Sequence, residues 1–134
     1  MNKHSKTICV VDDNPSVRKA LSRLIKSTGF NVKTYGSTQE FLNADHSQGS
    51  DLLVLDIRMP GMNGLDLQTY LVASGHTIPI VFITAHEDGI EKTKAIAAGA
   101  VAFFQKPLDE KDLLGAIYKG LNLNNTYKEG LRWN

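Results

Sequence analysis

Five polar side chains stand at the ends of short apolar runs of this sequence: Asp12, Asp13, Asp56, Thr84 and Lys106. The first two follow the run "ICVV" as an adjacent pair of acids. Adjacent like charges repel each other, and apolar surroundings disfavour the charged forms further. A chain that needed only a turn at this point could use Asn, Ser or Gly. The paired acids therefore indicate a chemical role rather than a structural one.

If the ends of these runs meet in the fold, the side chains form a set suited to phosphoryl transfer. Three crowded carboxylates need a cation, and a hard divalent ion such as Mg²⁺ (or Mn²⁺) takes carboxylate, carbonyl, water and phosphate oxygens. Lys106 would add a point charge and Thr84 a hydroxyl donor for phosphoryl oxygens that the metal does not reach. Asp56, which follows the apolar letters "LLVL", could then act as a nucleophile and become an aspartyl phosphate.

The elements that must position these side chains alternate along the chain. The apolar runs are Ile8–Val11, Val32–Tyr35, Leu52–Leu55, Ile80–Ile83 and Val101–Phe104. Most of them lack polar alternation, which is typical of strands buried on both faces of a parallel sheet. Amphipathic stretches between them predict helices that begin at Asn14-Pro15, at Thr38, after Asn63-Gly64, at Gly89 and near Asp109. The alternation predicts a doubly wound α/β fold with a five-stranded parallel sheet and helices on both faces.

Bulk properties favour a single cytoplasmic domain. The chain has 134 residues, a formal net charge of +1 and one cysteine, Cys9, which cannot form an internal disulfide. A reducing compartment is therefore expected, and neither a nucleic-acid surface nor a membrane segment is predicted. We interpret the basic side chains of the first helix, Arg18, Lys19, Arg23 and Lys26, as a solvated surface.

Four stretches occur in order across roughly Lys6 to Leu121: "VVDDN", "LLVLDIRMPGMNGL", "VFITAH" and "AAGAVAFFQKPL". With these motifs the chain resembles the receiver domain of two-component response regulators, and it is most similar to FixJ-type receivers. The resemblance implies a flavodoxin-like (CheY-like) fold with strand order 2-1-3-4-5. It also implies a receiver domain over residues 1–121, followed by a polar tail or linker over residues 122–134.

The resemblance assigns a role to each matching position. Asp56 would be the phosphoacceptor, and the metal ligands would be Asp12, Asp13, Asp56 and the backbone carbonyl of Arg58. Thr84 and Lys106 would bind the phosphoryl oxygens, and Thr84 would act with Phe103 as a conformational switch. Arg58 and His86 would tune the phosphoryl lifetime. A kinase helix would pack against Val17 and Ala20.

We also expect a cis peptide bond between Lys106 and Pro107, since X-Pro bonds reach cis at low cost.

The implied partner is a sensor histidine kinase or a phosphotransfer protein, and the switched surface would be the fourth helix, fifth strand and fifth helix. A phosphorylation-dependent homodimer is compatible with this reading, and no direct contact with nucleic acid or membrane is expected from this segment. FixJ-type regulators carry a DNA-binding domain after the receiver, and Gly120–Asn134 shows no helix-turn-helix. The sequence leaves open whether this receiver stands alone.

The leading interpretation is a signalling module that is not an enzyme beyond its self-catalysed phosphorylation and dephosphorylation. Two other classes of protein compete with this interpretation. A Mg²⁺-dependent phosphatase of the haloacid-dehalogenase kind also forms an aspartyl phosphate. It needs a second Asp two residues after its nucleophile, where this chain has Arg58 after Asp56 and Asn14 after Asp12. A flavin or nucleotide carrier is disfavoured because no Gly-rich phosphate loop is present and an acidic rim repels a bare phosphate.

Overall fold

The structure is a computed structural model, and it describes residues 6–44, 49–86 and 89–123. The strands of the described part are β1 (Thr7–Val11), β2 (Asn31–Tyr35), β3 (Leu52–Asp56), β4 (Ile80–Thr84) and β5 (Ala102–Gln105). The helices are α1 (Pro15–Lys26), α2 (Thr38–Asn43), α3 (Gly64–Ala73), α4 (Gly89–Ala97) and α5 (Glu110–Gly120). All strand pairs are parallel, and the order is β2-β1-β3-β4-β5, as the resemblance implies.

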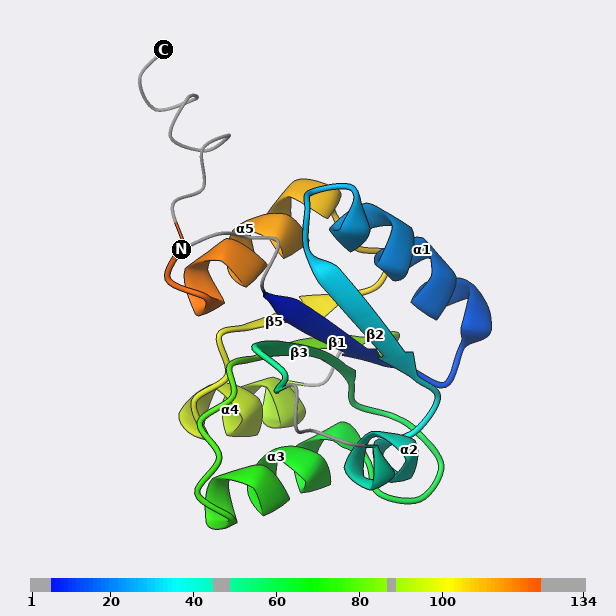
Figure 1. The fold of residues 1–134 in the computed structure, drawn as a ribbon. Helices are drawn as coiled ribbons and strands as arrows, with labels where there is room; N and C mark the ends of the chain where they lie inside the picture. Colours follow the sequence, from blue (N-terminus) through cyan, green and yellow to red (C-terminus); the bar gives the residue numbers. More distant parts are fainter. Residues whose placement is uncertain (1–5, 45–48, 87–88, 124–134) are drawn as a thin grey trace.

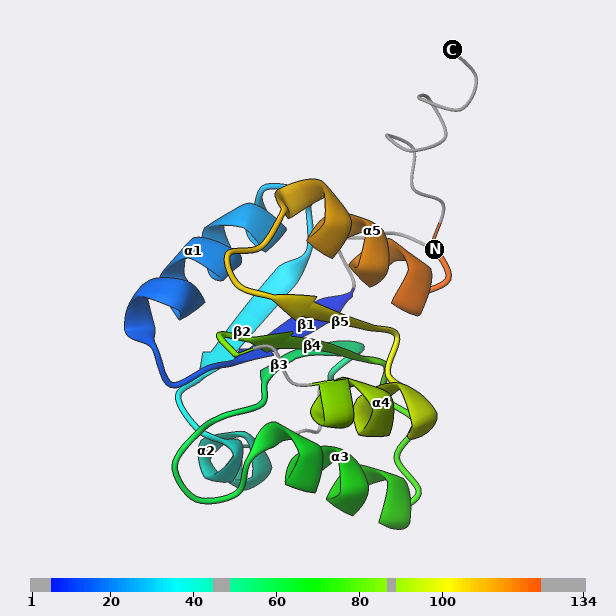
Figure 2. The same cartoon turned by 180° about the vertical axis from the view of Figure 1, so that it is seen from behind.

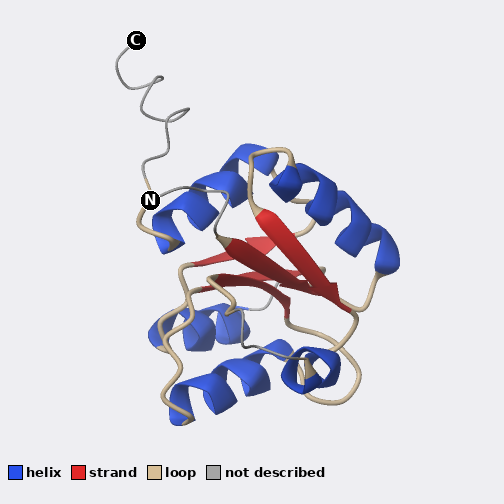
Figure 3. Cartoon of the chain, viewed as in Figure 1, coloured by secondary structure: helices blue, strands red, loops and turns tan. Residues whose placement is uncertain are grey.

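Helices cover both faces of the sheet, which confirms the predicted doubly wound architecture. Helices α1 and α5 lie on one face, and α2, α3 and α4 lie on the other (Figures 1 and 2). Side chains of each strand alternate between the two layers: Ile8 and Val10 pack in the core beneath α1 and α5, whereas Cys9 and Val11 pack in the core beneath α2, α3 and α4. The sheet is thus the middle layer of three (Figure 3).

Burial separates the central strands from the edges. Every residue of β1, β3 and β4 is buried, as expected for strands covered on both faces. The same expectation was wrong for β2 and β5, whose residues are partly or fully exposed. These two strands form the edges of the sheet, so each has a neighbouring strand on one side only.

Local sequence signals determine where the helices begin. The Asn14 side chain caps α1 by accepting from the backbone N–H groups of Ser16 and Val17, and Pro15 occupies the first turn. This arrangement follows the general preference for Asn at the cap and Pro just inside the helix. Asn63 forms a capping box at the start of α3. Because these caps follow β1 and β3 closely, they fix how the chain leaves the strand ends that carry the acids.

The end of the described chain lies just past α5, where Leu121 is the C-cap. Most of the predicted tail, residues 124–134, lies outside the described residues. Among the described residues, no helix combines the length and the apolar character that crossing a membrane would require.

Candidate functional site

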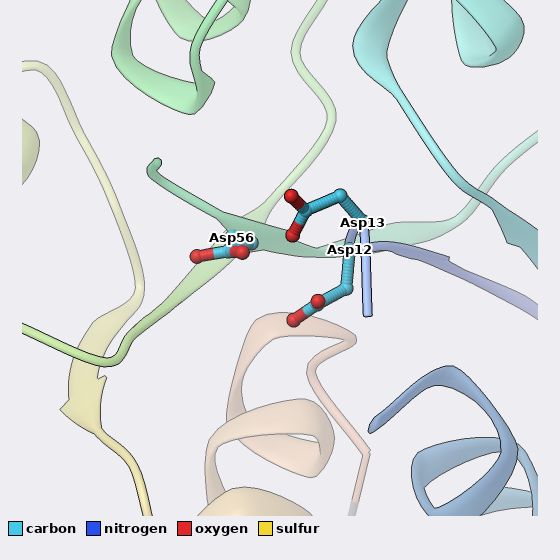
Figure 4. A group of neighbouring side chains, drawn as sticks. All are labelled: Asp12, Asp13 and Asp56. Carbon is cyan, nitrogen blue, oxygen red and sulfur yellow. The ribbon is translucent and has the colours of Figure 1, made fainter. Parts of the chain in front are cut away.

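The predicted meeting of the three acids is confirmed at the carboxyl ends of β1 and β3. Carboxylate oxygens of Asp12, Asp13 and Asp56 all lie within 4.8 Å of one another (Figure 4). Asp12 is fully buried and Asp56 is 4% exposed, whereas Asp13 is exposed. Strands β1 and β3 are neighbours in the sheet, so their carboxyl ends place side chains from sequence positions 12 and 56 side by side.

Lys106 reaches this acidic cluster from the segment after β5. Its Nζ atom lies 2.8 Å from Asp12 Oδ2 and 3.7 Å from Asp56 Oδ2, and its side chain is 20% exposed. The backbone N–H of Lys106 donates to the Thr84 carbonyl at 2.7 Å. The Lys106–Pro107 peptide bond is cis, as predicted. The Lys106 ammonium therefore contacts Asp12 and lies close to Asp56. Lys106 and Asp12 are 94 residues apart in the sequence.

The electrostatic balance of this cluster raises the pKa of Asp56. Burial is the main cause, and the charge of Asp12 adds to it. The Lys106 ammonium and a backbone hydrogen bond from Arg58 act in the opposite direction, and the resulting pKa is about 6. Since each pH unit above the pKa changes the ratio of forms tenfold, Asp56 is still mostly a carboxylate at neutral pH.

Thr84 lies at the end of β4, next to the strand that carries Asp56. Its side chain is fully buried, and its hydroxyl oxygen accepts a hydrogen bond from the backbone N–H of His86 at 3.2 Å. The His86 side chain is exposed. The hydroxyl is thus held by a local hydrogen bond from the His86 amide, which a hydrogen bond to another group could replace.

The structure distinguishes the two adjacent aromatic residues of β5. Phe103 is partly buried in the layer of α2, α3 and α4, and its ring centroid lies 6.3 Å from that of Phe82. Phe104 packs in the opposite layer, beneath α1 and α5. This alternation follows from the two-residue period of a strand, and it places Phe103, rather than Phe104, on the side of α4.

Arg58 makes a contact that sequence reasoning did not predict. Its guanidinium Nη2 lies 3.2 Å from Glu91 Oε1, in the first turn of α4, and the Arg58 side chain is 50% exposed. The two residues are 33 positions apart, and no local pattern links them. The ion pair connects the loop after Asp56 to the helix of the expected output surface.

Arg18 was expected to belong to a solvated basic face, and that interpretation was wrong for this residue. Its side chain is partly buried, and Nη1 donates to the backbone carbonyl of Asp12 at 2.7 Å. Its helical position, six residues after Asp12, brings it back over the strand end, which linear sequence does not reveal. Of the two residues expected at the kinase surface, Val17 is partly buried and Ala20 is exposed.

Comparison with known proteins agrees with this geometry. The sequence matches the family described as "Response regulator receiver domain" over residues 8–118. The response regulator protein TmoT of Ectopseudomonas mendocina is 46% identical over 96% of this chain and 59% of its own length. The crystal structure of FixJ-N superposes with a TM-score of 0.79 at 35% identity, covering 87% of this chain and 94% of that one.

The low-resolution structure of response regulator StyR gives a TM-score of 0.80 at 45% identity, covering 95% of this chain and 64% of that chain. The chain spans between 53% and 59% of the length of the curated relatives it matches. The acidic cluster, the Lys106 contact and these matches together show that the chain belongs to the response regulator receiver domain family.

Proposed function

We propose that this chain is the phosphoacceptor of a two-component signalling system and that Asp56 accepts the phosphoryl group. One observation carries the proposal: the Lys106 ammonium lies 2.8 Å from Asp12 and 3.7 Å from Asp56, beside the acidic cluster. A cation at that position can neutralise charge on an incoming phosphoryl group without blocking the Asp56 carboxylate. Membership of the receiver family supports the same assignment.

The transfer forms one bond and breaks another. A carboxylate oxygen of Asp56 attacks the phosphorus of a phosphohistidine, an O–P bond forms, and the N–P bond breaks with its electron pair passing to the imidazole nitrogen. The imidazole then takes a proton from solvent. Such a step depends on positioning and charge neutralisation. A pKa of about 6 keeps the Asp56 nucleophile mostly ionised at neutral pH.

The cluster fits a hard divalent cation. Asp12, Asp13 and Asp56 offer carboxylate oxygens within 4.8 Å of one another, which are the donors that Mg²⁺ or Mn²⁺ prefers. We infer that these three residues and the backbone carbonyl of Arg58 hold the ion. When bound, it supplies charge neutralisation for phosphoryl oxygens. Lys106 and the Thr84 hydroxyl would bind the remaining phosphoryl oxygens.

Phosphorylation would change the surface formed by α4, β5 and α5. The Thr84 hydroxyl would leave the His86 amide for a phosphoryl oxygen, and the Phe103 ring would move into the space that the hydroxyl leaves. A ligand shifts such an equilibrium by the difference in its affinity for the two states. The altered surface would act on an output domain, a partner or a second copy of this chain.

The phosphoryl donor would be a sensor histidine kinase or a phosphotransfer protein in the cytoplasm. Its helix would pack on α1 at Val17 and Ala20, close to the acidic cluster. Residues 1–121 would form the receiver unit and residues 122–134 a tail or linker. The phosphatase alternative gains no support, since Arg58 occupies the place of its required second acid and pairs with Glu91.

Intact-mass measurement with acetyl phosphate and Mg²⁺ tests the phosphoacceptor. Wild-type protein should gain one phosphoryl group, and Asp56→Asn should gain none. The matched control is Asp112→Asn, the same chemical change at an exposed acid of α5, which should label like wild type. Full labelling of Asp56→Asn would show that the acceptor is another residue.

A further inference from the structure

Asp12 is held through every polar group that it possesses. Its backbone N–H donates to the Tyr35 carbonyl at 3.1 Å. One carboxylate oxygen accepts from the Asn14 backbone N–H at 2.8 Å, and the other accepts from Lys106 Nζ at 2.8 Å. Its carbonyl oxygen accepts from Arg18 Nη1 at 2.7 Å. The position of Asp12 is thus determined by four separate contacts, of which only one comes from α1.

Asp13 is in the opposite situation. Within the described residues, its carboxylate makes no hydrogen bond or ion pair, although it lies within 4.8 Å of the other two acids. Its orientation therefore depends on the backbone. The Asp12 carbonyl belongs to the planar peptide unit that joins Asp12 to Asp13, so rotation of that plane would also move the Asp13 side chain. Arg18 donates to the carbonyl oxygen of this plane.

The Arg18 guanidinium is itself confined. A Cβ atom added to Gly36 would lie 3.3 Å from Arg18 Nη1 and 3.2 Å from Glu40 Oε2, so both side chains approach the bare backbone of that glycine. The Gly36 backbone N–H donates to Glu40 Oε1 at 3.1 Å. The loop between β2 and α2 thus restricts where the guanidinium can lie.

We propose that Arg18 is a positioning residue for the divalent cation site: it holds the Asp12–Asp13 peptide plane so that the Asp13 carboxylate faces Asp12 and Asp56. The proposal rests on the metal site of the proposed function. Charge and position predict opposite effects here. Arg18 is a cation near a cation site, so by charge alone its removal would tighten metal binding, whereas loss of its positioning role would weaken it.

The test is the dissociation constant for Mg²⁺ alone, measured by calorimetry or by NMR titration of the full chain. Arg18→Met should bind Mg²⁺ about tenfold more weakly, the size of effect usual when a group that orients a metal ligand is removed. The matched control is Arg23→Met, which removes the same charge from an exposed position of the same helix. It should bind Mg²⁺ as wild type does, or slightly more tightly. Arg18→Lys keeps the charge and one donor and should recover part of the affinity.

Two further measurements separate positioning from general damage. In the Asp13→Asn background, Arg18→Met should cost little additional affinity, because the carboxylate through which Arg18 acts is gone. In metal-free protein, Arg18→Met should change the backbone amide resonance of Asp13, whereas Arg23→Met should leave it unchanged. If Arg18→Met does not fold, Arg18→Lys carries the same comparisons.

Unchanged or tighter Mg²⁺ binding by Arg18→Met would overturn the positioning role, and so would an equal loss in the Asp13→Asn background. Wild-type protein that binds no Mg²⁺ would overturn the metal site of the proposed function and this inference with it. The two failures are therefore distinguishable from the wild-type measurement alone.

Discussion

The raised pKa of Asp56 predicts that its carboxylate destabilises the metal-free protein at neutral pH. We consider Asp56→Asn, which replaces the carboxylate with a neutral amide of nearly the same shape. The side chain is buried, and the charge of Asp12 lies close to it, so the ionised form is disfavoured in the folded state. In the unfolded chain the same group is solvated and ionises more readily.

The magnitude follows from the two pKa values. The pKa of Asp56 rises from 3.8 to about 6 on folding. A difference of that size corresponds to about 3 kcal/mol, at 1.36 kcal/mol for each pH unit. Because the folded state binds the proton more tightly, the free energy of unfolding falls as pH rises from 3.8 through 6. The penalty is absent below this window and complete above it.

The assay is urea or thermal unfolding in EDTA at pH 4 and at pH 8. At pH 4 the variant and the wild type should have similar stability. At pH 8 Asp56→Asn should be more stable by about 3 kcal/mol, or on the order of 10 °C in Tm for a chain of this size. The control Asp112→Asn, at an exposed acid in the first turn of α5, should lose about 0.3–1 kcal/mol through the helix dipole. A variant no more stable than wild type at pH 8 would refute the electrostatic reasoning.

Three further predictions concern the surroundings of Asp56. In Gly64→Ala the new Cβ would collide with the Asp56 carbonyl and lie 3.1 Å from the Ile57 Cα, so we expect a loss of about 1–3 kcal/mol in chemical denaturation. Unchanged stability would mean that the segment between β3 and α3 can move to accommodate the new Cβ atom without a loss of free energy. In Lys106→Met the carboxylates lose their nearest cation, so the pKa of Asp56 should rise further above its ordinary value and labelling by acetyl phosphate at neutral pH should slow at least tenfold. A carboxyl ¹³C titration measures the pKa of Asp56, and intact mass measures the labelling rate. Wild-type values in both measurements would show that Lys106 has no role in the site. The double variant Arg58→Asn with His86→Glu introduces groups that can orient a water, and the phosphoryl group should be lost about tenfold faster, a barrier change of ~1.4 kcal/mol. Loss of labelled phosphate in excess Mg²⁺ measures this rate, and decay at the wild-type rate would leave both side chains without influence.

The sequence by itself determined the secondary structure and the residues at the strand ends. Asn14-Pro15 and Asn63-Gly64 begin helices because capping and backbone restriction act within a few residues. The apolar runs lie within one residue of the observed strands, and in β1, β3 and β4 the apolar composition matches complete burial. The five polar residues at the ends of four of these runs were found in the same way. The strand order 2-1-3-4-5 came with the family resemblance, because periodicity does not specify which strands are neighbours.

Only the tertiary structure decided the interactions between residues distant in sequence. The exposure of the edge strands β2 and β5 follows from the strand order, since each of them lacks a neighbouring strand on one side. The Arg58–Glu91 ion pair joins residues 33 positions apart.

The raised pKa of Asp56 and the contact of Arg18 with the Asp12 carbonyl depend in the same way on the folded arrangement. The pKa of Asp56 depends on the burial of the end of β3 and on the separation between Asp12 and Asp56. The Arg18 contact requires α1 to turn back over β1. Both are set by three-dimensional packing around β1 and β3. Desolvation and Coulomb interactions act through space, and folding brings together charges that the sequence keeps far apart.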